Sequence, residues 1–333
     1  MEFIIPIFKW LHVIAGVLWI GLLYYFNWIN GHVVATMDGD SKKKVVPELM
    51  PRALYFFRWG AAWTWITGLV LLLIVYWMMM NDSMFAEPGI DGASKFKHFA
   101  YLIPFLMVFV YDAFYKSPLA KDTRIATIIS FMGIAGVLAF LVFVSEMTSY
   151  RAYNIHIGTM FGSIMAFNVW YRIWPAQQRI ITAIKNGEAP EPADAGMAGL
   201  RSKHNTYMSF PLIWTMINEH TVGVSHYLEG YGVLLVMIAL GWHIVWHLYK
   251  KSGTILDSRK SSNELTLAQS IGIFTAILFS LSFFLPFINY GNEGLSLWTA
   301  STLSGNTDWI GVLALIIGSV ILILNNEKKV AAA

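Results

Sequence analysis

The sequence predicts an all-α fold, a polytopic membrane bundle of nine transmembrane helices with the N-terminus outside and the C-terminus inside. Three observations lead to this prediction. The 333 residues are 56% hydrophobic and only 13% charged, whereas soluble domains carry roughly 25% charged residues. Apolar runs of about 20 residues, the length that crosses a bilayer, recur along the chain. Lysines and arginines also alternate between connections in the manner that orients membrane helices.

The apolar runs set the expected helices in order. We expect spans at residues 4–27, 54–80, 98–115, 124–145, 154–174, 207–224, 230–249, 267–290 and 308–325. The sixth run has the weakest pattern, because Pro211, Asn218, Glu219 and His220 interrupt it. The whole chain, residues 1–333, is therefore interpreted as a single integral membrane domain.

The basic residues orient this bundle. With these spans, all but Lys9, Lys95, Lys97 and Arg151 of the 23 lysines and arginines fall on one side of the membrane. Cytoplasmic connections carry such an excess, so that side is expected to be the inner one. The longest connection, residues 175–205, contains the polar run KNGEAPEPADAGMAG and is expected to be a cytoplasmic loop.

The first helix carries a histidine at membrane depth. At 100° per residue, six residues of this helix, three of them polar, fall within about 80° of one face. That face consists of His12, Gly16, Trp19, Leu23, Asn27 and Asn30. Unpaired polar groups in hydrocarbon cost several kcal/mol, so this face is expected to lie against protein.

Composition excludes several classes of site. The chain has no cysteine, which excludes disulfides, iron–sulfur clusters, thiolate metal sites and c-type haem attached through C-x-x-C-H. No Walker A sequence, strand-framed G-x-G-x-x-G or H-E-x-x-H is present. The net charge of +3 does not indicate a nucleic-acid partner, because the basic residues follow the membrane topology. The first apolar run is too long for a cleavable signal peptide, so the opening helix is expected to be retained.

The histidines suggest a haem b site. His12, His156 and His220 come from three expected helices at similar depth in the outer half. Imidazoles from different helices can clamp a porphyrin inside a bundle, so any two of these could ligate the iron. His243 and His247, one turn apart near the inner face, could hold a second haem. The same histidines could instead hydrogen-bond neighbouring helices or lie at the headgroups.

Two arginines are candidates for binding an anion. Arg58 lies one turn inside the second expected helix, and Arg52 precedes it in the same segment. A guanidinium in such a place can snorkel to the headgroups or hold a carboxylate or another small anionic substrate.

Three segments resemble the membrane domain of bacterial cytochrome-coupled urate oxidase (urate hydroxylase). They are MPRALYFFRWGAAWTWITGL (Met50–Leu69), HIGTMFGSIMAFNVWYRIWPAQQRII (His156–Ile181) and RSKHNTYMSFPLIWTM (Arg201–Met216). The resemblance implies oxidation of urate to 5-hydroxyisourate in a bacterial inner membrane, with electrons leaving to a cytochrome c. That family typically ends in a cytochrome c domain with C-x-x-C-H. This chain is expected to end instead in a ninth apolar run and a basic tail, which implies either a separate acceptor protein or a membrane scaffold that serves another redox task.

The first helix carries a second resemblance. Lys9–Tyr25 is similar to the first helix of the membrane protoporphyrinogen oxidase family, in which a histidine at that place is associated with haem b. Two other functions remain open from the sequence. The chain could be a haem-binding or structural subunit of a larger respiratory complex. It could also be an organic-anion transporter with broken helices at Pro211 and Pro286.

Overall fold

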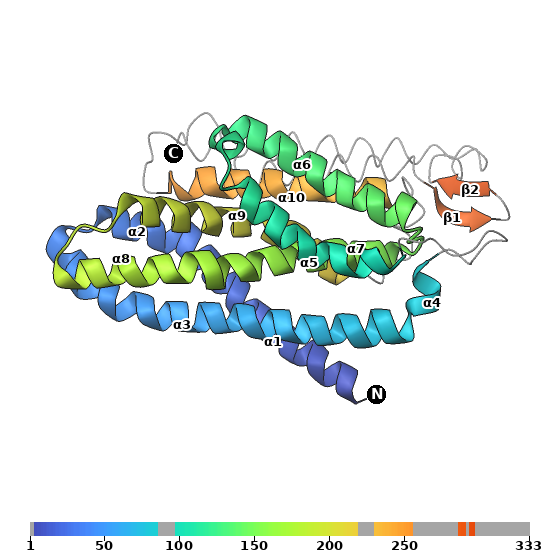
Figure 1. Cartoon of the computed structure of the whole chain (residues 1–333), viewed down its shortest axis with the longest axis horizontal. Coiled ribbons are helices and arrows are strands. Elements are labelled where there is room, and N and C mark those ends of the chain that lie inside the picture. Colours follow the sequence, from blue (N-terminus) through green and yellow to red (C-terminus); the bar gives the residue numbers. More distant parts are fainter. Residues whose placement is uncertain (1–2, 86–96, 219–229, 256–285, 291–292, 297–333) are drawn as a thin grey trace, which may run out of the picture. The chain divides into compact units, whose positions relative to one another are not determined.

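The computed structural model describes residues 3–85, 97–218, 230–255, 286–290 and 293–296. The chain divides into two compact units, Met1–Trp246 and His247–Ala333, which are described separately. The described part of the first unit is helical throughout, apart from short connections (Figure 1). The all-α prediction is therefore confirmed for this unit.

The first unit begins with an antiparallel helix pair. α1 (Ile4–Tyr24) continues through the π-helical η1 (Tyr25–Asn30) into α2 (Gly31–Thr36). Asp38 then caps α3 (Gly39–Leu71), because its carboxylate accepts a 2.9 Å hydrogen bond from the backbone N–H of Ser41. α3 runs back beside α1 and ends in the π-helical η2 (Leu72–Met79).

The pair packs closely because one of its helices carries glycine at the contact. A Cβ on Gly60 would lie 3.3 Å from the backbone of Trp19, whose side chain is 1% exposed. Leu23, one turn further along α1, is fully buried. Asn27 donates a 2.8 Å hydrogen bond to the hydroxyl of Ser202 in α9. The polar face of the first helix thus lies against protein, as its spacing predicts.

The remaining elements complete the bundle. They are α4 (Asn81–Met84), α5 (Lys97–Phe114), η3 (Pro118–Lys121), α6 (Thr123–Ala139), η4 (Phe140–Val144), α7 (Tyr150–Phe167), η5 (Asn168–Ile173), α8 (Trp174–Asn186), α9 (Pro192–Ile217) and α10 (Tyr231–Ser252). α7 is buried on nearly every side and packs against α3, α5 and α9. A Cβ on Gly158 would lie 2.2 Å from the hydroxyl of Thr215, so α7 and α9 can approach this closely only through glycine.

The expected loop at residues 175–205 is largely helical. Pro175 starts α8 at a position that needs no backbone N–H, and Gly187 ends it in the left-handed conformation (φ 79°). Pro192 starts α9 in the same way. Helix-stop and helix-start residues a few positions apart therefore produce a helical hairpin where the polar composition had suggested irregular structure.

Four described helical segments are long and apolar enough to cross a membrane. They are Ile4–Thr36, Gly39–Met79, Thr123–Val144 and Tyr231–Ser252, and the shorter apolar helix His98–Phe114 joins them. In the second unit, β1 (Pro286–Tyr290) and β2 (Glu293–Ser296) form an antiparallel pair. The expected span 267–290 is thus wrong at its end, where residues 286–290, rich in β-branched and aromatic side chains, pair as a strand. The span 308–325 lies outside the described residues.

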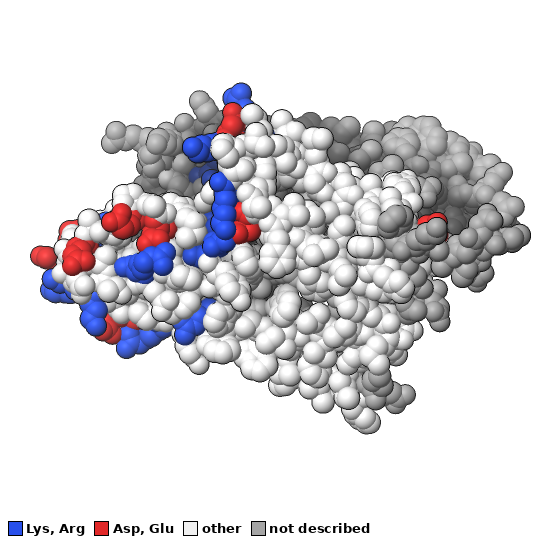
Figure 2. Space-filling model, viewed as in Figure 1, with Lys and Arg blue, Asp and Glu red and all other residues white. Residues whose placement is uncertain are grey.

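The surface separates charge from apolar side chains. Figure 2 shows charged residues gathered toward the end of the first unit where α2, α8 and the start of α9 lie in Figure 1. Elsewhere, large apolar side chains are open, for example Trp10 (64% exposed) and Phe109 (67% exposed). Apolar exposure spread over several helices is far more than a soluble monomer presents, and it is typical of a lipid-facing surface.

Candidate functional site

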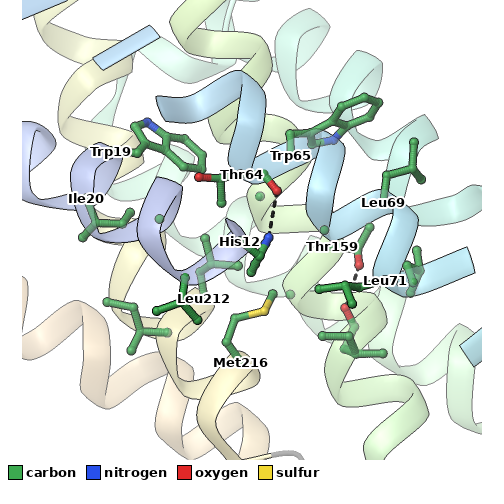
Figure 3. Close-up of a pocket in the computed structure, with 18 of the residues that line it drawn as sticks. His12, Trp19, Ile20, Thr64, Trp65, Leu69, Leu71, Thr159, Leu212 and Met216 are labelled. Atoms are coloured by element: carbon green, nitrogen blue, oxygen red, sulfur yellow. Dashed lines mark hydrogen bonds between the residues drawn. The ribbon is translucent and has the colours of Figure 1, made fainter. Parts of the chain in front are cut away.

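A cavity of about 680 Å³ lies between α1, the C-terminal half of α3, α7 and the end of α9. Its walls are mainly apolar, and Figure 3 shows His12 in the middle of the labelled side chains. Glycines from three helices line it, namely Gly16, Gly21, Gly68, Gly158 and Gly162. Because glycine has no side chain, Gly16, Gly21 and Gly162 leave space open beside the helix backbones, whereas His12 and Thr215 fill the places beside Gly68 and Gly158.

The neighbours of His12 fix its ring. Nδ1 lies 2.9 Å from the carbonyl oxygen of Thr64 and 3.1 Å from Oγ1 of Thr67. The Thr67 hydroxyl donates its proton to the carbonyl of Trp63, 2.6 Å away, so it can only accept from the imidazole. Nδ1 therefore carries the proton, and Nε2 has a free lone pair.

That lone pair is available to a ligand. Among the described residues, no hydrogen-bond partner lies within reach of Nε2, although His12 lines the cavity. A Cβ on Gly68 would lie 2.8 Å from Cε1 of the ring, so glycine is required where the imidazole rests on α3. Metal-binding histidines commonly donate the opposite N–H to a backbone carbonyl in this way.

Two cations stand among the lining residues. Lys9 lies one turn before His12, and Arg151 lies in the first turn of α7. No carboxylate belongs to the described lining of this cavity. Nε of Arg151 is buried and has no hydrogen-bond partner among the described atoms. The cavity therefore combines apolar walls, one available imidazole nitrogen and two cations.

His156 is held in a different environment. It is 0% exposed, Nδ1–H donates to the carbonyl of Ala152 at 2.7 Å, and Nε2 accepts from the indole of Trp77 at 3.2 Å. Both ring nitrogens are thus engaged, and His156 is not among the residues that line the cavity with His12. The structure does not bring these two histidines together. His220 lies outside the described residues.

His243 and His247 lie on α10. His243 lines a second cavity and stacks on Trp246, with the ring centroids 5.8 Å apart. His247 belongs to the second compact unit, and its place relative to the first unit is not described. No group of three or more His, Asp or Glu side chains that could hold a metal ion occurs within the described part of the chain.

The two candidate arginines line neither cavity. Arg52 is exposed and pairs with Glu48 one turn away, at 2.7 Å from its carboxylate. The guanidinium of Arg58 lies 3.9 Å from the ring centroid of Trp174 and 5.5 Å from that of Tyr55. Cation–π contacts therefore hold Arg58 between α3 and α8, away from His12.

Sequence reasoning missed several residues of the cavity. Lys9 could have been found from its spacing, since it lies three residues before His12 and so occupies a neighbouring place on the helix. Thr64, Gly68 and Arg151 depend on which helices adjoin α1 and carried no local signal. His204, which we expected at a loop or helix end, lies within α9 and lines the second cavity.

Helices able to cross a membrane, packed around a cavity with one available imidazole, define the class as polytopic helical proteins with an internal cavity. A family model described as urate oxidase N-terminal matches residues 39–280. The chain belongs to that family. The match begins with α3, so α1 and His12 precede it. Neither the curated proteins nor the solved structures gave a match to the chain.

Proposed function

We propose that this protein is a membrane oxidoreductase that converts urate to 5-hydroxyisourate in the bacterial inner membrane. Urate and water give 5-hydroxyisourate, two protons and two electrons, and a separate cytochrome c accepts the electrons. Membership of the urate oxidase N-terminal family supports the substrate. The helices long enough to cross a bilayer support the location in a membrane.

One observation carries the redox part of this proposal. The proton of His12 lies on Nδ1, held by Thr64, and Nε2 is left unpartnered beside an apolar cavity. An imidazole that only joined two helices would need no open space at its second nitrogen. An imidazole that ligates a cofactor needs both features.

Haem b fits the residues of this cavity. His12 would supply an iron-ligating nitrogen, and the apolar walls suit the porphyrin ring. Lys9 and Arg151 would bind its two carboxylates, which need cationic partners in an environment of low polarity. When bound, the haem supplies a centre that accepts and releases one electron at a time.

The chain's own residues position and shield this site. Thr64 and Thr67 fix the tautomer of His12, and Gly68 sets how closely its ring lies on α3. Trp65 donates a 2.9 Å hydrogen bond to Ser163, so these polar groups satisfy each other at the cavity wall. The surrounding apolar side chains exclude water.

The test is turnover by the purified, haem-loaded protein. Urate is added with a soluble cytochrome c, and urate loss and cytochrome reduction are followed together by absorbance. We expect two cytochromes to be reduced for each urate consumed, without a requirement for oxygen. Absence of both signals would contradict the urate reaction. Bound haem without turnover would instead favour the haem-carrying subunit of a larger respiratory complex.

A further inference from the structure

A second cavity of about 750 Å³ lies between α5, α6, α7, α9 and α10. α7 separates the two cavities, because opposite faces of this helix line them. Gly158, Thr159 and Gly162 line the His12 cavity, whereas Met160, Phe161 and Ile164 line the second one. The second cavity therefore has its own lining and needs its own explanation.

Aromatic rings form much of this lining. The ring centroids of Tyr115 and His204 are 4.3 Å apart. Trp242 lies 4.5 Å from Phe131 and 5.5 Å from Tyr207. Flat rings on two sides of a cavity favour a planar ligand, because stacking adds to the apolar area that the ligand buries.

A hydrogen-bond network fixes the proton of His204. Asn168 donates to the hydroxyl of Tyr111 at 3.0 Å, and that hydroxyl lies 2.9 Å from Nδ1 of His204. All these groups are satisfied when Tyr111 donates its proton to Nδ1. Nε2 of His204 then carries a proton and has no hydrogen-bond partner among the described residues. This N–H group lines the cavity and can donate a hydrogen bond to a ligand.

The charge around this donor is positive. Lys203 is the only formally charged residue in the described lining, and no carboxylate belongs to it. Arg201, 3% exposed, lies behind the rings of Tyr111 and Tyr115, at 4.8 and 5.5 Å from their centroids. The nearby carboxylate of Asp112 is already paired with Arg172, Lys116 and Arg201.

His204 contributes a neutral donor to this site. Burial, with the positive charges of Arg201 and Lys203 nearby, lowers the pKa of His204 to about 3. The ring is therefore uncharged at neutral pH, and Lys203 supplies the cationic charge at the cavity itself.

We propose that the second cavity binds a planar, singly charged heteroaromatic anion. The ring lies among Tyr115, Trp242 and Phe131, the Nε2–H of His204 donates to it, and Lys203 pairs with its charge. The identification of this anion as urate rests on the proposed function. The urate ring that is oxidised and the haem would then lie on opposite sides of α7.

The test is urate binding to the full chain in lipid nanodiscs, measured by titration calorimetry. We expect His204→Phe and Lys203→Gln each to weaken binding about tenfold or more, because each removes a contact to a charged ligand. Lys185→Gln removes a positive charge from α8 and lies outside the cavity, so its affinity should equal that of the wild type. Hypoxanthine, a neutral purine, should bind at least tenfold more weakly than urate.

Other outcomes separate this site from the proposed reaction. His204→Gln keeps a side-chain N–H donor and should recover part of the affinity that His204→Phe loses, which excludes a folding defect as the cause. Urate binding that these variants weaken, without any turnover, would keep the site and remove the reaction. Equal affinity of wild type, His204→Phe and Lys203→Gln for urate would overturn the site, as would equal binding of hypoxanthine.

Discussion

Nδ1 of His12 and the carbonyl oxygen of Thr64 lie 2.9 Å apart, across the contact between α1 and α3. A helix carbonyl already accepts its own backbone hydrogen bond, so the imidazole uses its second lone pair. This contact orients the ring and leaves Nε2 toward the cavity. The predictions below follow from that arrangement and from the charges around the two cavities.

Gly68→Ala should displace His12. The new Cβ would lie 2.8 Å from Cε1 of the imidazole, and overpacking of this kind costs about 1–3 kcal/mol. We expect a shifted or weakened haem absorption spectrum and a lower thermal midpoint. Gly136→Ala in α6 is the matched control, because nothing lies within 4 Å of its Cβ and Gly136 lines neither cavity. Equal spectra for the two variants would contradict the packing described for His12.

Lys9→Gln and Arg151→Gln should loosen haem without removing its iron ligand. Each substitution takes away one cationic partner for a haem carboxylate. We expect this loss to weaken the affinity for haem about threefold to tenfold. We expect faster haem transfer to apomyoglobin in both variants, with the band positions unchanged. Transfer rates equal to that of the wild type would show that these cations do not contact the haem.

Asp112→Asn should destabilise the bundle around the contact of α5 with η5 and α9. The carboxylate accepts from Nε of Arg172 at 2.8 Å and from Arg201 at 3.1 Å, and it also pairs with Lys116. Removing the negative charge leaves the buried Arg201 without its counter-ion, which we expect to cost about 3 kcal/mol. Thermal unfolding in detergent measures this loss.

Asp194→Asn serves as the control for Asp112→Asn. Asp194 pairs with Arg179 between α8 and α9, and that contact holds the pKa of Asp194 below its usual value. Such an exposed pair contributes little, and its contribution is lost only as pH falls through this lowered pKa. At neutral pH, Asp194→Asn should therefore leave the thermal midpoint nearly unchanged. A larger effect than that of Asp112→Asn would contradict the ranking of the two pairs.

His204 should make the protein sensitive to acid. The unfolded chain takes up a proton below the ordinary pKa of 6.5, whereas the folded ring resists protonation until about pH 3. Stability therefore falls as pH falls through this window, by about 2 kcal/mol at about pH 5. Tyr111 and Tyr115, whose rings face His204, stay neutral over this range.

Unfolding measured against pH tests this linkage. His204→Gln removes the titrating group but keeps a polar side chain, so its stability should decline less steeply than that of the wild type between about pH 6.5 and 4. Parallel curves for the two proteins would mean that His204 is not held neutral by its surroundings.

Local patterns predicted an all-helical first unit with several helices long enough to cross a membrane, whereas the number of nine spans stays a prediction. The apolar runs located these helices, and the polar face of α1 could be assigned because helical spacing depends on one segment alone. The hairpin of α8 and α9 was missed because its composition is polar, although Pro175, Gly187 and Pro192 signalled its ends. Capping residues were more informative here than hydropathy.

The sequence did not predict which residues of different helices are in contact. Thr64 lies 52 residues from His12, and Tyr111 lies 93 residues from His204. Which helices adjoin, and how each is rotated, decides these pairs. The rotation of α7 turns His156 toward Trp77 and away from the cavity of His12, although the two histidines were expected at similar depth.

The optical spectrum of the dithionite-reduced protein tests the role of His12 most directly. We predict a haem b α-band in the wild type and in His32→Ala, which removes an exposed histidine of α2, and loss of that band in His12→Ala. Added imidazole should restore the band in His12→Ala, provided that the variant elutes as the wild type does in size exclusion. A His12→Ala protein that keeps the band, or a wild-type protein without haem iron, would contradict the assignment.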